Sequence, residues 1–211
     1  MTVTYMSHNP NQSGKNLTII PEEDISMNPS PINPGFEIWE ETFQQLFDRA
    51  VETFESGVRD SAQMFSHAEK LFLESIGATP QEIFDFVEDW SEDGVPTPEI
   101  IREVTGLRQE YFLQVQDGKL ESKKMISDGL PSPWASLGGH RWLPRIIAKA
   151  RAKLRGELPP HIMYGCGMDR PFLEDRNIGL SEFLRKVWDA EEDDEKILNY
   201  VNQKAEGHDT A

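Results

Sequence analysis

The sequence contains very little cysteine: a single residue, Cys166, among 211. One cysteine excludes an internal disulfide and a zinc site built from several cysteines, and it is typical of a protein kept in a reducing compartment. No apolar run approaches the roughly 18 residues that span a bilayer. The first residues also lack the basic start and apolar core of a secretory signal. We therefore expect a soluble protein of the cytoplasm with no membrane partner.

Basic residues are also scarce, because Lys and Arg number 21 against 37 Asp and Glu, for a net charge of −16. The imbalance is uneven along the chain. Residues 36–115 hold 18 acidic and 5 basic residues, residues 116–190 hold 9 and 13, and residues 191–211 hold 7 and 2. Binding to nucleic acid depends on Lys and Arg that neutralise phosphates, so no nucleic-acid partner is expected. The contrast predicts instead that the basic segment docks on the acidic one.

Runs that alternate apolar and polar residues are rare, which argues against strands. From Phe36 onward apolar residues recur every three or four positions, the period of a helix with one buried face. The sequence TPQE at 79–82 is a helix start signal, with a capping threonine, a proline in the first turn and a glutamate at the third position. Within residues 111–126, either the helix that begins at Pro98 continues to Val115 or a two-stranded ribbon turns at Asp117-Gly118, and the helix is favoured. The predicted fold is all-α.

The periodicity also predicts which side chains form the core. These are Trp39, Phe43, Phe47, Phe54, Leu71, Phe72, Ile83, Phe86, Leu143, Ile147, Phe172, Phe183 and Val187.

Two segments, 71–104 and 171–201, share an order of features. Each reads Phe-Leu-Glu, then Ile-Gly, a helical segment with paired apolar residues, an acidic gap and a shorter helical segment. Such an echo predicts an internal duplication, with two similar small helical lobes packed together. Chance similarity between helical sequences is the alternative.

The domain organisation follows from these patterns. Residues 1–35 contain five prolines and predict an extended or disordered N-terminal arm. An acidic helical lobe is expected over 36–128, a second helical domain over 129–205 and a disordered tail over 206–211. The apolar residues within 16–20 are the part of the arm suited to docking on a partner or on the body.

The C-terminal region carries three ordered motifs: "SPWASLGGHRWLPRIIAKARAKLRGEL", "YGCGMDRPFLE" and "EEDDEKILNYV". With these motifs, residues from about 131 to 205 resemble the bacterial domain-of-unknown-function family 5069. Members of that family tend to have Asn-Cys-Pro-Leu-Asp where this chain has Gly-Cys-Gly-Met-Asp at 165–169. The resemblance implies a domain and no established activity.

The cysteine turn and the basic helix that precedes it are the candidate functional features. Arg145, Lys149 and Lys153 are spaced to share one helix face, suited to an anion, an acidic partner or the acidic half of the same chain. Glycines at 138–139 and arginine forks suit a carboxylate or phosphate. The residues predicted to contact such a ligand are His140, Arg141, Arg145, Tyr164, Cys166 and Arg170. The alternative is that these arginines pair with Asp169, Asp175 and the acidic lobe.

Cys166 has two interpretations. A nucleophilic thiolate needs a nearby base or cation, for which His161, His140, Arg170 and Asp169 are candidates in the sequence. A buried structural cysteine in a tight turn is the simpler interpretation. No histidine pair or acidic loop has metal-ligand spacing, so neither a metal nor a cofactor is expected.

The sequence thus leaves two functions open. The first is a non-catalytic binding or protein-interaction module that uses the arm or the cleft between lobes. The second is a small-molecule enzyme or anion-binding protein that uses the basic helix and the cysteine turn.

Overall fold

The computed structural model describes residues 34–120 and 129–208, and these residues belong to one compact unit. They form helices connected by short turns, with one pair of two-residue strands, so the predicted all-α fold is confirmed. The elements are α1 (Pro34–Glu55), α2 (Ser61–Met64), α3 (His67–Ser75), α4 (Pro80–Asp93), α5 (Pro98–Gln114), β1 (Ser136–Leu137), β2 (His140–Arg141), α6 (Leu143–Arg155), α7 (Asp169–Glu174), α8 (Leu180–Ala190) and α9 (Asp194–His208).

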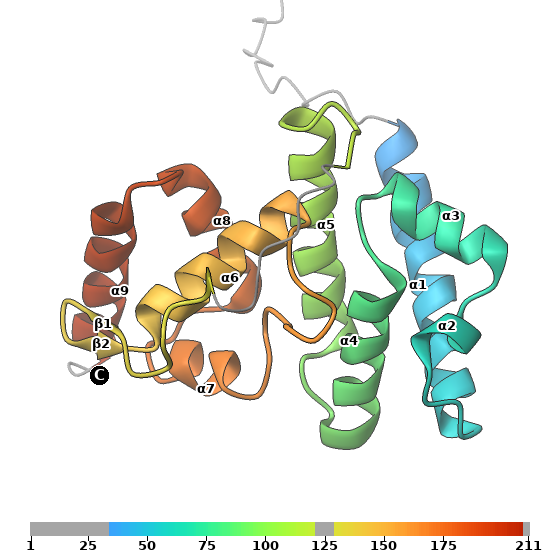
Figure 1. Cartoon of the computed structure of the whole chain (residues 1–211), viewed down its shortest axis with the longest axis horizontal. Coiled ribbons are helices and arrows are strands. Elements are labelled where there is room, and N and C mark those ends of the chain that lie inside the picture. Colours follow the sequence, from blue (N-terminus) through green and yellow to red (C-terminus); the bar gives the residue numbers. More distant parts are fainter. Residues whose placement is uncertain (1–33, 121–128, 209–211) are drawn as a thin grey trace, which may run out of the picture. The chain divides into compact units, whose positions relative to one another are not determined.

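Helix α5 lies between two groups of helices (Figure 1). On one side α1 packs against α4, and α2 also contacts α4. On the other side α6 and α8 pack against each other and both contact α5, while α8 also contacts α7 and α9. One continuous apolar core runs through both groups, with Trp39 near its beginning in the sequence and Val201 at its end. The predicted lobe boundary at 128/129 stays a prediction, as does the duplication.

The ends of the chain are partly outside the described residues. The predicted arm falls there apart from Pro34 and Gly35, which belong to the first turn of α1. Helix α9 continues to His208, beyond the predicted helical end at residue 205. The segment 121–128 is not described either, so the ribbon alternative is tested only on its N-terminal half. That half is helical to Gln114, and Gly118 N–H then closes the turn on Phe112 O at 2.9 Å.

Helix starts follow the local signals in the sequence. Thr79 Oγ1 accepts a hydrogen bond from Glu82 N–H at 3.2 Å, which satisfies one of the free amides of the first turn of α4. A complete capping box is formed before α3 by Ser66 and Glu69, with both reciprocal bonds present. The carboxylate of Glu82 lies instead against Lys153 of α6, so its side chain serves a contact between helices.

Eleven of the predicted core residues are buried and two are not. Leu71 is 52% exposed, which corrects the prediction, and Phe72 is only partly buried. The buried apolar face of α3 is carried by Leu73 and continues at Ile76 in the turn after the helix. Because α3 has about two turns, its short apolar pattern fits more than one face equally well.

Arg108 is the most unusual member of the interior, with no exposed surface. Its Nη1 donates to Leu154 O at 2.8 Å and to Gln116 Oε1 at 2.7 Å, and Gln116 in turn donates to Arg155 O at 3.1 Å. The last carbonyls of a helix lack partners within the helix and carry its negative dipole end, which favours a cation there. No carboxylate among the described residues pairs with Arg108. Helix α5 is thus fastened to the end of α6 by a buried cation.

Two glycines make room for this guanidinium. A Cβ atom at Gly156 would lie 2.5 Å from Arg108 Nη2, and one at Gly77 would lie 2.7 Å from Phe112 Cγ and 3.1 Å from Arg108 Cζ. Burial lowers the pKa of Arg108 to about 10, so the side chain remains charged at neutral pH.

Replacing Arg108 by Met should lower the free energy of unfolding by about 2–4 kcal/mol, because the Leu154 carbonyl at the end of α6 and the Gln116 side chain lose a charged donor inside the core. Arg102→Met on the same helix, where the side chain is partly exposed, is the matched control and should cost less than about 0.5 kcal/mol. Urea unfolding followed by circular dichroism measures both variants. Equal losses would show that Arg108 contributes no more than a surface arginine.

Candidate functional site

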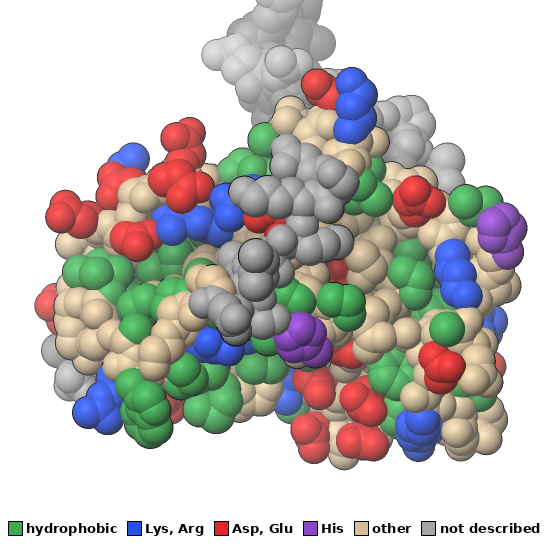
Figure 2. Space-filling view, viewed as in Figure 1, with side chains coloured by type: hydrophobic (Ala, Val, Ile, Leu, Met, Phe, Trp, Pro, Cys, Tyr) green, Lys and Arg blue, Asp and Glu red, His purple; other side chains and the backbone are tan. Residues whose placement is uncertain are grey.

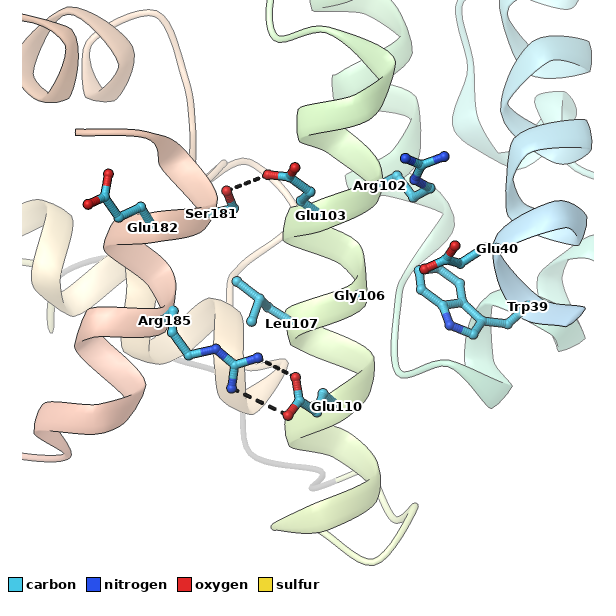
Figure 3. Close-up of a pocket in the computed structure, with 10 residues that line it drawn as sticks. All are labelled: Trp39, Glu40, Arg102, Glu103, Gly106, Leu107, Glu110, Ser181, Glu182 and Arg185. Atoms are coloured by element: carbon cyan, nitrogen blue, oxygen red, sulfur yellow. Dashed lines mark hydrogen bonds and ion pairs between the residues drawn. The ribbon is translucent and has the colours of Figure 1, made fainter. Parts of the chain in front are cut away.

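A groove of about 470 Å³ lies where α1, α5 and α8 meet (Figure 3). Helix α1 contributes Trp39 and Glu40, α5 contributes Arg102, Glu103, Gly106, Leu107 and Glu110, and α8 contributes Ser181, Glu182 and Arg185. Its lining therefore comes from both groups of helices.

The apolar part of the groove is formed by Trp39 and Leu107, which are 5% and 9% exposed. Gly106 explains why the indole lies so close to α5: a Cβ atom at this position would meet ring carbons of Trp39 at 3.3 and 3.4 Å. A glycine inside a helix costs up to about 1 kcal/mol relative to alanine, and here it permits a close approach between helices.

Two polar contacts join α5 to α8 beside the groove, as the dashed lines of Figure 3 show. Ser181 Oγ donates to Glu103 Oε2 at 2.6 Å, and Arg185 forms an ion pair with Glu110. These contacts fix the spacing of the two helices on either side of Leu107. On the α8 side, Glu182 pairs with Lys204 of α9 at 2.7 Å.

Asp169 organises the cysteine turn as a fully buried carboxylate. It accepts hydrogen bonds from Trp142 Nε1 at 2.8 Å, from Gly165 N–H at 2.9 Å and from Lys149 Nζ at 2.5 Å. Lys149 is also buried, and its ammonium and the carboxylate neutralise each other. A buried pair of this kind is tolerated because further donors satisfy the carboxylate.

Lys149 Nζ also lies 3.1 Å from Cys166 Sγ, and Cys166 is partly exposed. An ammonium donor at this distance stabilises negative charge on sulfur, which is the form of cysteine that reacts as a nucleophile. Asp169 holds the lysine in place, so carboxylate, ammonium and sulfur form one chain of contacts. Lys149 was not among the partners of Cys166 predicted from the sequence. It precedes Cys166 by seventeen residues and was predicted to lie on the basic face of a helix.

The other predicted ligand residues have separate partners. His140 shares a hydrogen bond of 2.7 Å with Asn202 of α9, Arg145 Nη1 donates to Pro131 O at 2.7 Å, and Arg141 is exposed. Gly138 and Gly139 form the turn between β1 and β2, so their amides are not part of the first turn of α6. The structure does not bring His140 and Arg145 to a shared partner.

Tyr164 and Arg170 lie close to Asp169 but are also engaged. Tyr164 is buried and donates from its hydroxyl to Leu180 O at 2.8 Å, and burial raises the pKa of its phenol well above the usual value. Arg170 donates from Nη1 to Gly165 O at 2.9 Å and pairs with Asp89 of α4 at 2.5 Å. Together with the Lys153–Glu82 pair, this joins the basic segment to the acidic one, as the charge contrast predicted. Among the described residues Arg170 pairs with a carboxylate, whereas no salt bridge is formed by Arg141 or Arg145.

Helix α4 supplies the acidic side of this interface, and acidic side chains gather at its end in Figure 2. Asp85 is partly buried and lies with Tyr164 at a small cavity of about 30 Å³. Burial raises the pKa of Asp85 to about 6; a hydrogen bond from Gln81 opposes this, while the nearby Glu88 and Asp89 charges add to it. No group of three or more His, Cys, Asp or Glu in residues 34–120 and 129–208 is arranged to hold a metal ion. None of the helices in these ranges is long and apolar enough to cross a membrane.

Replacing Asp85 by Asn should stabilise the protein near neutral pH and have little effect near pH 4. Because its pKa is higher in the folded protein than in the unfolded chain, the ionised form of Asp85 costs stability above about pH 6, and this cost disappears as pH falls toward 4. The expected gain at about pH 7.5 is roughly 1–2 kcal/mol, reduced from the full shift because the group is partly exposed. Unfolding curves at both pH values test this, with Glu41→Gln as control; the same gain at both values would contradict the assignment.

A comparison with known proteins gives a match in the C-terminal region of the chain. No curated protein and no solved structure is significantly similar to the chain. The region that holds α6, the cysteine turn, α7, α8 and α9 does match a family model. The resemblance inferred from the sequence motifs is thus confirmed: residues 127–211 match the family described as Domain of unknown function (DUF5069).

Proposed function

We propose that this protein is a protein-interaction module that binds a peptide segment of a partner in the groove between α1, α5 and α8. The observation that carries the proposal is the composition of this groove: an apolar part at Trp39 and Leu107 with charged side chains on the surrounding helices. Protein interfaces commonly have an apolar centre with a polar rim.

The size of the groove also supports this proposal. Its volume of about 470 Å³ falls in the range of ligand-binding pockets. Three helices with fixed spacing offer a preformed surface for apolar side chains of an incoming helix or extended segment. The contacts Ser181–Glu103 and Arg185–Glu110 hold two of these helices together without a ligand, which limits the entropy lost on binding.

The test is a selection from a random peptide library against the whole protein, followed by affinity measurements on the enriched peptides. Ser181→Trp, which places a large side chain at the groove, should weaken their binding by about tenfold or more, or 1.4 kcal/mol. Ser75→Trp, at the exposed end of α3, is the matched control and should leave binding within about twofold. Peptides that bind the wild type and the Ser181→Trp protein equally well would sink the proposal, provided that circular dichroism shows both variants folded.

A second candidate function is thiol chemistry at Cys166, and the contact of 3.1 Å with Lys149 Nζ favours it. Iodoacetamide reports on this directly, because the sulfur displaces iodide and forms a thioether. The thiol should react about tenfold faster than glutathione at the same pH, since the buried ammonium stabilises the attacking thiolate. Lys149→Met should remove the advantage, whereas Lys186→Met should not. A wild-type rate at or below that of glutathione would leave Cys166 with a packing role only.

A further inference from the structure

Some charged side chains of the groove form ion pairs within the protein, and others do not. Arg185 is neutralised by Glu110, and Glu182 by Lys204. Glu103 is exposed and accepts a hydrogen bond only from the neutral hydroxyl of Ser181 among the contacts of the described residues. Glu40 of α1 likewise has no salt bridge within the described part of the chain. Two carboxylates, on different helices, thus lack a cationic partner.

These two carboxylates come from two of the three helices that line the groove. Figure 3 places Glu40 beside Trp39 on α1, and Glu103 on α5 next to α8. Arg102 is the remaining cation of the lining and forms no salt bridge among the described residues, so two carboxylates without an ion pair stand against one such arginine. An occupant that extends along the groove from α1 to α8 therefore meets both Glu40 and Glu103.

The negative net charge of residues 36–115 also favours a cationic ligand. Residues 36–115, which contain α1 to α5, hold 18 acidic and 5 basic residues. A surplus of one sign around a groove attracts ligands of the other sign and raises their association rate, and this effect weakens with salt. An acidic peptide would have to bring its carboxylates against this field and against both glutamates, so like-charge repulsion disfavours it.

From this arrangement we infer that the occupant of the groove is a basic peptide segment, with an apolar side chain between two Lys or Arg residues. The apolar side chain packs on Trp39 and Leu107, and the flanking cations pair with Glu40 and Glu103. This inference rests on the proposed function, because it names the chemistry of the partner at the same groove. Arginine suits this role better than lysine, since its planar fork forms two hydrogen bonds with a carboxylate.

A basic peptide also has a competing acidic surface on this protein, the exposed end of α4, where Glu92 and Asp93 lie. The experiment must therefore separate binding in the groove from attraction to acidic surface in general. The groove variant is the double substitution Glu40→Arg and Glu103→Arg. Its matched control is Glu41→Arg with Glu92→Arg, which changes net charge by the same amount at exposed positions outside the groove lining.

The probe is a synthetic peptide library in which a central apolar residue is flanked by Arg, by Glu or by Gln, screened at about 0.15 M salt. We expect enrichment of the Arg-flanked peptides. The groove double variant should weaken their binding by roughly thirtyfold, and the control double variant by no more than about threefold. The groove variant should also bind the Glu-flanked peptide better than the wild type does, because the charges are exchanged.

The possible results distinguish the inference from the function on which it rests. If Gln- or Glu-flanked peptides are enriched and Ser181→Trp abolishes their binding, the groove binds peptides but the inferred chemistry is wrong. If both double variants weaken Arg-flanked peptides equally, the attraction is general and the inference is overturned. If no peptide depends on Ser181, the proposed function fails, and the inference with it.

Discussion

The position of α5 depends on one buried hydrogen bond, from Arg108 to the carbonyl of Leu154 at the end of α6. A cation inside a core is costly unless its surroundings carry negative charge, and here the Leu154 carbonyl at the end of α6 supplies part of it in place of a carboxylate. The same positioning sets α5 against α8 through Glu103 and Glu110, and against α1 through Gly106. The groove exists because this central helix is held from both sides.

Charge is used differently at the two interfaces of the basic helix α6. Lys149 faces its own C-terminal region and is neutralised by Asp169, whereas Lys153 faces α4 and contacts Glu82. The helix thus carries two buried lysines, one turn apart, that have carboxylate partners from opposite halves of the chain. Burial lowers the pKa of Lys153 to about 7. Buried pairs of this kind add little net stability, but they disfavour other arrangements in which a charge would be buried alone. The contrast in net charge along the sequence is therefore expressed as contacts within the molecule.

Much of the fold was predictable from the sequence, because helical periodicity and local start signals are properties of neighbouring residues. Thr79 caps α4 as expected. The apolar residues predicted for the core in α1 and α8 are buried. Leu71 was assigned to the core wrongly, since α3 is too short for its period to define a face. The groove was not predictable: Trp39, Gly106 and Ser181 are far apart in the sequence, and only packing brings them together. The Lys149–Cys166 contact was missed for the same reason, because the two residues lie in different elements and only packing brings them together.

The two glycines beside Arg108 have a consequence for how this sequence can change over time. At Gly156 and Gly77 any side chain would occupy space already filled by the guanidinium or by Phe112, and both backbones have positive φ values of 69° and 71°. A larger residue at Gly156 would require a shorter side chain at position 108 and would still have a strained backbone, and shortening the arginine alone leaves the Leu154 carbonyl without this donor. Arg108 and Gly156, from separate parts of the chain, therefore restrict each other's substitution. Among related sequences they should be retained together or replaced together, and intermediate combinations should be rare.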